Sequence, residues 1–148
     1  FDLVVASVHS GFTMTEADAT ERVIQAVSHP ATTVLGHPTG RLLLVREGYP
    51  LDHRAVIDAC AEHNVALELN ANPYRLDIDW THVRYAVEQG VPISINPDAH
   101  ATDELDNVRW GVAAARKGGL TAEHCLTAKS LDAFTHWLEH RPSVASAA

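Results

Sequence analysis

Two side chains that can bind a metal ion, Asp98 and His100, lie two residues apart in the sequence Asn-Pro-Asp-Ala-His at 96–100. The apolar run at 91–95 predicts a buried strand, so both side chains are expected in the loop after its C-terminal end. A carboxylate oxygen and an imidazole nitrogen on one short turn suit a divalent cation that activates water. Asp and His are also ordinary loop residues, so the interpretation depends on whether other strands bring similar groups to the same place.

The rest of the chain alternates between predicted strands and predicted helices. Apolar runs bounded by polar loops predict strands at 2–7, 32–35, 65–69, 91–95 and 125–127. Helices that open with a capping Thr, Asp or Ser are expected at about 15–28, 52–63, 79–90, 102–118 and 130–140. This order predicts an α/β fold of about five βα units, with parallel strands joined by right-handed crossovers.

Five units are too few for the usual eight-stranded barrel. The sheet is therefore either open or the back portion of a barrel whose first strands are absent. The chain begins at Phe1 without an initiator Met, and a predicted strand begins almost at once, which favours the second interpretation. Residues 142–148 are expected to form a flexible C-terminal tail.

Polar side chains occupy the same place after the other predicted strands. His9 and His37 directly follow the first two strands, and Asn70 and Asn72 follow the third. Because the C-terminal ends of parallel strands meet at one rim, these side chains are expected to lie near the Asp-x-His loop. The ligands predicted for a divalent metal at this rim are His9, His37, Asp98 and His100.

The other histidines do not fit this pattern. His136 and His140 have metal-compatible spacing, but they lie on the polar arc of a predicted helix, which is typical of a solvated face. His53 falls in a first helical turn on the functional side, and its role stays open. The remaining histidines are assigned to a polar helix side, a helix end or the opposite rim: His82, His29, His63 and His124. Cys60 lies on an apolar arc and is interpreted as a packed thiol.

Two arginines, Arg41 and Arg75, follow the second and third predicted strands. Either could hold a phosphate with its bidentate guanidinium, or form a structural ion pair with Asp77 or Asp79. Asn72 shares the second of these loops. Arg41, Arg75 and Asn72 are therefore candidate substrate-binding residues. The sequence has no glycine-rich phosphate loop, HExxH or GxSxG motif, so nucleotide-fold kinases, zinc proteases and serine hydrolases lack support.

The composition is that of one globular domain, with 148 residues, 46% of them apolar and 20% charged. A formal charge of −8 argues against a free-standing nucleic-acid module and fits a site that binds cations. The two cysteines are far apart, which indicates a reducing compartment. No run is long enough for a membrane helix and no signal peptide is evident, so a cytoplasmic protein without membrane partners is expected.

Four motifs resemble those of the polymerase and histidinol phosphatase (PHP) domain: ASVHS at 6–10, LGHPTGR at 35–41, ELNANPYRLD at 68–77 and INPDAH at 95–100. The chain is similar to the version found at the C-terminus of bacterial family X DNA polymerases, from about Asp2 to Arg141. The resemblance implies a distorted seven-stranded, TIM-like barrel holding up to three divalent ions, zinc or manganese. It also implies a 3'-5' exonuclease or related phosphoesterase that acts on DNA 3' ends in repair.

The resemblance carries the metal-ligand role onto His9, His37, Asp98 and His100. The family's other ligands, an HxH pair, a further His and a bridging Glu, lie upstream of the matched region and are not in this sequence. Residues 1–141 are therefore expected to be the C-terminal part of the domain. Its partners would be the N-terminal half of the barrel and an upstream polymerase domain, and the segment alone is expected to be incomplete.

Two alternatives remain at this point. One is a small-molecule phosphatase of the histidinol phosphatase type on the same fold. The other is a non-catalytic PHP module that serves as a scaffold. The Asn-Ala-Asn-Pro-Tyr-Arg stretch at 70–75 favours the polymerase-linked version, and the presence of all four ligands speaks against the scaffold.

Overall fold

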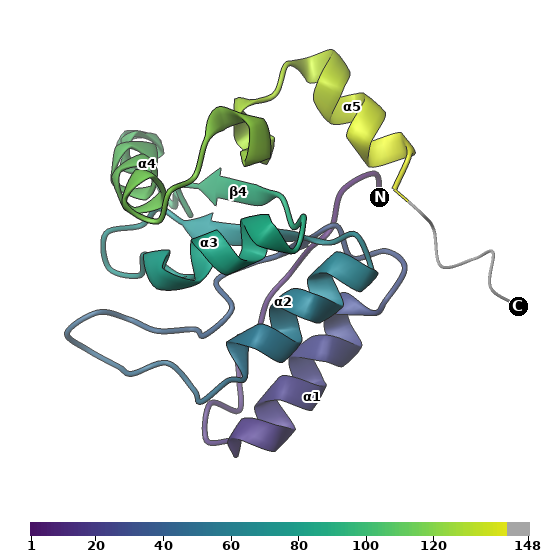
Figure 1. The fold of residues 1–148 in the computed structure, drawn as a ribbon. Helices are drawn as coiled ribbons and strands as arrows, with labels where there is room; N and C mark the ends of the chain where they lie inside the picture. Colours follow the sequence, from purple (N-terminus) through teal and green to yellow (C-terminus); the bar gives the residue numbers. More distant parts are fainter. Residues whose placement is uncertain (142–148) are drawn as a thin grey trace, which may run out of the picture.

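The computed structural model describes residues 1–141; the tail predicted at 142–148 lies outside the described residues. Four parallel strands form one sheet in sequence order (Figure 1). They are β1 (Val5–Ala6), β2 (Val34–Leu35), β3 (Ala66–Asn70) and β4 (Ile93–Asn96). This confirms the predicted α/β class with parallel strands. The arrangement is compatible with part of a barrel, and a seven-stranded closure stays a prediction.

The helices follow the strands as predicted. They are α1 (Glu16–Val27), α2 (His53–Glu62), α3 (Trp80–Glu88), α4 (Val108–Lys117) and α5 (Leu131–Glu139). The capping side chains of Thr15, Asp52, Asp79 and Ser130 each accept a hydrogen bond from a backbone N–H in the first turn. None of the described helices is long and apolar enough to cross a membrane.

The fourth predicted helix starts later than expected. Residues Thr102–Asn107 form a 3-10 helix, and Thr102 makes no capping bond. Glu104 instead accepts a hydrogen bond from the backbone N–H of His100 at 2.6 Å. This bond ties the first turn back to the 96–100 loop, and the α-helix begins only at Val108.

The predicted fifth strand at 125–127 is wrong. Cys125 makes a single parallel bridge to Ile93, and the chain then turns into the 3-10 helix Leu126–Ala128. The backbone N–H of Ile95, which would have joined a fifth strand, donates to the hydroxyl of Thr127 at 3.1 Å. A side chain therefore satisfies the edge of β4 where a backbone carbonyl was expected.

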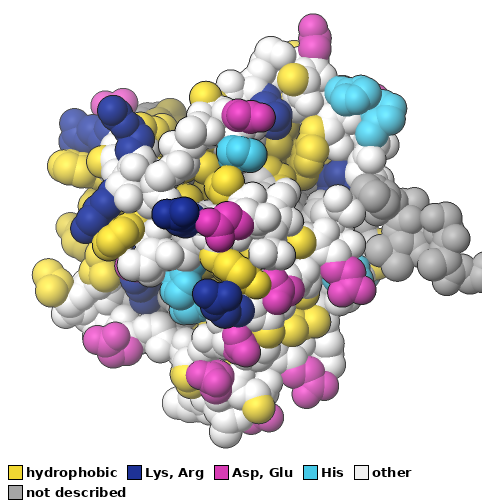
Figure 2. Space-filling model, viewed as in Figure 1, with side chains coloured by type: hydrophobic (Ala, Val, Ile, Leu, Met, Phe, Trp, Pro, Cys, Tyr) yellow, Lys and Arg dark blue, Asp and Glu magenta, His cyan; other side chains and the backbone are white. Residues whose placement is uncertain are grey.

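The two faces of the sheet have different characters. One face packs its leucines and isoleucines against α1 to α4 and forms the main core. The other face carries apolar side chains near the start of the strands, under α5, and polar ones toward their C-terminal ends: Glu68, Asn70, Ser94 and Asn96. Acidic and basic side chains are interspersed on the surface shown in Figure 2, without a broad basic field. The polar half of the sheet positions the candidate site.

Candidate metal centre

His9 and His37 lie together at the C-terminal rim of the sheet, as the strand pattern predicted. Their rings meet edge to face with centroids 4.9 Å apart. The side chain of His9 is exposed, whereas His37 is buried directly after β2. Burial, and next the charge of Arg75, lower the pKa of His37, so its ring is disposed to be a neutral metal ligand.

Asp98 and His100 follow β4 on the same rim. The Nδ1 atom of His100 lies 2.9 Å from the carbonyl oxygen of Asp98, which fixes Nδ1 as a donor and leaves Nε2 with its lone pair. The side chain of His100 is largely exposed, at 77%. The second nitrogen of this ring is thus free to bind a ligand from the open side of the rim.

Two of the four candidate ligands have backbone angles that side chains rarely adopt. His37 has a φ of 26° and Asp98 a φ of 52°. Such left-handed conformations cost free energy in residues other than glycine, and they are frequent at functional sites. The loops after β2 and β4 therefore hold these two side chains in strained positions on the same rim.

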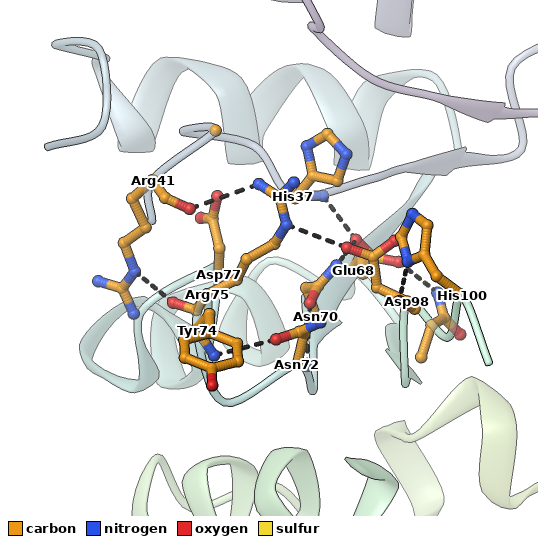
Figure 3. Close-up of polar contacts among 12 residues, drawn as sticks. His37, Arg41, Glu68, Asn70, Asn72, Tyr74, Arg75, Asp77, Asp98 and His100 are labelled. Carbon is orange, nitrogen blue, oxygen red and sulfur yellow. Dashed lines mark hydrogen bonds and ion pairs between the residues drawn. The ribbon is translucent and has the colours of Figure 1, made fainter. Parts of the chain in front are cut away.

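A buried carboxylate that the sequence analysis did not single out, Glu68, links these loops (Figure 3). Its Oε2 accepts the backbone N–H of His37 at 2.6 Å and the amide of Asn70 at 3.3 Å. Its Oε1 accepts the amide of Asn96 at 2.7 Å. Desolvation raises the pKa of Glu68, and the three donors oppose that shift. The alternation of residues along β3 could have placed this acid on the same face as Asn70.

A second buried acid, Asp77, fixes the loop that follows His37. Its Oδ2 accepts the backbone N–H of Thr39 at 3.0 Å and the Thr39 hydroxyl at 2.9 Å. Burial raises the pKa of Asp77. Within residues 1–141, neither Oδ1 of Asp77 nor Nδ1 of His37 has a hydrogen-bond partner, although both are buried. The loop therefore retains unused polar atoms next to a candidate ligand.

Both candidate phosphate-binding arginines form ion pairs. Arg41 pairs with Asp79 at 3.1 Å, one of the two acids expected from the sequence. Arg75 pairs with Asp98 at 3.0 Å, an interaction that the sequence did not indicate (Figure 3). The guanidinium of Arg75 thus neutralises the one carboxylate among the four candidate ligands.

Asn72 is occupied in a turn. Its side-chain oxygen accepts the backbone N–H of Tyr74, and its own N–H donates to the side chain of Asn70, both at 3.0 Å. These bonds shape the loop after β3. A contact between Asn72 and a substrate stays a prediction.

The other histidines and Cys60 are also placed. His53 and His82 stack against each other with ring centroids 4.0 Å apart, away from the four candidate ligands. His82 is half-buried, so its predicted place on a solvated helix side is wrong, because α2 packs beside α3 there. Histidines on the surface of α5 are exposed, as expected (Figure 2). Cys60 is fully buried, which raises the pKa of its thiol to about 12.

The candidate ligands are arranged as two pairs. Among residues 1–141, no three His, Cys, Asp or Glu side chains are close enough to hold a metal ion together. His9 with His37, and Asp98 with His100, nevertheless offer imidazole and carboxylate donors on one rim, with an unused buried nitrogen on His37. This donor set fits part of a divalent-metal site.

Comparison with known proteins gives relatives but no matching family model. The DNA polymerase/3'-5' exonuclease PolX of Bacillus subtilis is 44% identical over 130 residues, which cover 88% of this chain and 23% of that protein. A probable phosphatase of Caldicellulosiruptor saccharolyticus is 31% identical over 70% of this chain and 44% of its own length. One of Thermoanaerobacter is 24% identical over 82% of this chain and 51% of its own length. The chain thus spans about half or less of each relative.

Proposed function

We propose, from its membership of the family that includes bacterial PolX and from its PHP motifs, that this chain supplies part of a metal-dependent phosphoesterase site. The observation that carries the proposal is the convergence of His37 and Asp98 around Glu68. Both ligands have strained backbones, and an arginine able to bind phosphate already contacts one of them.

Four residues would hold the metal: His9, His37, Asp98 and His100. Zinc or manganese ions, up to three in a complete domain, would supply a hydroxide nucleophile and offset charge on the phosphate oxygens. Glu68 orients the loop that carries His37 through the backbone N–H of that residue. The Asn96 amide, which follows β4, bonds to the same carboxylate and holds the second loop in register with the first.

Arg75 is the residue proposed to bind the substrate phosphate. Its guanidinium pairs with Asp98 here, so a cation that engages Asp98 releases it for an anionic substrate. Arg41 has a supporting role, because it bonds to Asp79 and to the carbonyl of Arg75. It holds the backbone from which the Arg75 side chain extends.

The proposed substrate is the 3' end of DNA, with the activity forming part of a family X DNA polymerase that acts in repair. The name of the Bacillus subtilis relative supports this substrate, as does its 44% identity over most of this chain. The remaining metal ligands would come from the part of the barrel that corresponds to regions outside the matched segment.

A small-molecule phosphatase is the second candidate. It is supported by the several relatives described as probable phosphatases, which this chain matches at lower identity but over a larger share of their length. A scaffold role is disfavoured by the four intact ligand positions.

The test is Mn²⁺-stimulated release of nucleotides from a labelled DNA 3' end by the intact protein, with p-nitrophenyl phosphate as the competing small ester. The variants are His37→Ala and Asp98→Asn, with exposed His29→Ala as the matched control. Loss of DNA hydrolysis in the first two alone supports the proposal. Unchanged hydrolysis in both means that the site is wrongly assigned, and hydrolysis of the small ester alone favours the phosphatase.

A further inference from the structure

We propose that Tyr74 and the tip of the 42–46 hairpin, Leu44 and Val45, form a platform on which a base of single-stranded nucleic acid stacks beside the site. These three residues are called the base platform below. The inference rests on the proposed phosphoesterase and deepens it, because it assigns the class of substrate.

The base platform is unusually exposed for its chemistry. Leu44 is 107% exposed, Val45 79% and Tyr74 68%. Loop tips are normally polar, and large apolar side chains on them have no core to stabilise them. The backbone N–H of Leu43 donates to the carbonyl of Tyr74 at 2.7 Å, so the hairpin and the tyrosine belong to abutting segments.

The hairpin is held firmly although its tip is exposed. Leu42 and Arg46 form an antiparallel bridge, and the N–H groups of Val45 and Arg46 both donate to the carbonyl of Leu42. Leu44 has a φ of 65°, a left-handed conformation that a leucine adopts at a cost. Because Leu44 packs against no core, the strain serves no internal packing and instead presents the side chain outward.

Arginines join the hairpin base to its surroundings. Arg41 donates to the carbonyls of Arg75 and Leu76, and Arg46 donates to the carbonyl of Gly40 at 2.6 Å. The Arg46 guanidinium also lies 4.1 Å from the centroid of the Phe12 ring. The segment between β2 and α2, which contains the hairpin, extends away from the sheet in Figure 1. A surface clamped in this way loses little conformational freedom when a ligand binds.

The position and charge of the platform favour a nucleobase as its occupant. Tyr74 precedes Arg75, the proposed phosphate ligand, and its ring points away from His37 and Glu68 (Figure 3). A base stacked on this ring would therefore lie outside the metal ligands while its phosphate reaches toward them. Within residues 1–141, Arg46 makes no ion pair, so its charge is available to a neighbouring backbone phosphate. Aromatic rings next to arginines are the usual elements of single-strand binding.

The test measures binding of 5'-fluorescein-labelled dT10 to the intact protein by fluorescence anisotropy. Tyr74→Ala is expected to weaken binding about 5- to 100-fold, the range for one lost base-stacking contact. Tyr74→Phe should bind within about twofold of wild type, since stacking needs the ring and not the hydroxyl. Leu44→Ser should weaken binding several-fold. Trp110→Ala, which removes an exposed aromatic residue from α4, is the matched control and should have no effect.

The proposal is overturned if Tyr74→Ala binds dT10 as tightly as wild type, or if Trp110→Ala weakens binding equally. Mn²⁺-dependent hydrolysis of bis(p-nitrophenyl) phosphate by the wild type tests the phosphoesterase separately, because that ester does not require an oligonucleotide surface. Hydrolysis without a Tyr74 effect on dT10 removes the base platform alone. A Tyr74 effect on binding without hydrolysis removes the phosphoesterase and leaves a nucleic-acid site.

Discussion

The Nε atom of Arg75 lies 3.0 Å from Oδ2 of Asp98, and both side chains are largely removed from solvent, at 19% and 23% exposed. An ion pair this sheltered is screened less by water and salt than one on the surface. The only carboxylate among the candidate metal ligands is therefore already bound to a cation, and a metal must compete with the guanidinium for it.

The first prediction concerns this competition. Arg75→Met is expected to strengthen Mn²⁺ binding by the intact protein about 10-fold, because a positive charge next to the metal position is removed. Isothermal titration calorimetry would measure the dissociation constant. Arg84→Met, which breaks an exposed pair with Glu88, is the control and should not change it. Weaker Mn²⁺ binding by Arg75→Met would show that the arginine supports the metal site instead of competing for it.

The second prediction concerns Glu68. Glu68→Gln is expected to lower the free energy of unfolding by about 2–4 kcal/mol, because an amide NH₂ replaces one of two oxygens that accept three hydrogen bonds. Urea denaturation at pH 7 measures this, with exposed Glu88→Gln as the control. Unchanged stability would mean that Glu68 is protonated in the folded protein and donates a hydrogen bond.

The third prediction concerns pH. Burial, and next the charge of His82, lower the pKa of His53 to about 4 from 6.5. Between these values the unfolded chain binds a proton at this residue and the folded chain does not, so this contribution destabilises the protein as pH falls from about 6.5 to about 4. His53→Gln should therefore lose less stability than wild type between pH 7 and pH 5, by about 1 kcal/mol. Urea denaturation at both pH values is the measurement, and exposed His136→Gln should behave like wild type. An identical pH dependence in His53→Gln and wild type would contradict the assignment.

The sequence predicts the shared rim well, because a βα rhythm places the residue after each strand at the same edge. His9 and His37 indeed meet there, and the capping residues open their helices as expected. Contacts between distant segments were not accessible in this way. The Arg75–Asp98 pair joins two loops, and a helical wheel shows the polar side of His82 but not that α2 covers it.

Side-chain substitution for backbone bonds explains the remaining differences. The strand predicted at 125–127 had suitable residues, but the Thr127 hydroxyl takes the N–H of Ile95 that a strand would have used. Glu68 was missed because a single acid in an apolar strand resembles ordinary alternation. Its importance comes from His37 and Asn96, which reach it from 31 and 28 residues away in the sequence.

The most direct test of the metal centre is a Co²⁺ titration of the intact protein followed by visible absorption, which reports the ligands of the bound ion independently of catalysis. Wild type and His136→Ala should develop the same Co²⁺ bands. His37→Ala and Asp98→Asn should each lose or markedly weaken them. If both variants bind Co²⁺ with the spectrum and affinity of wild type, the rim described here does not hold the metal.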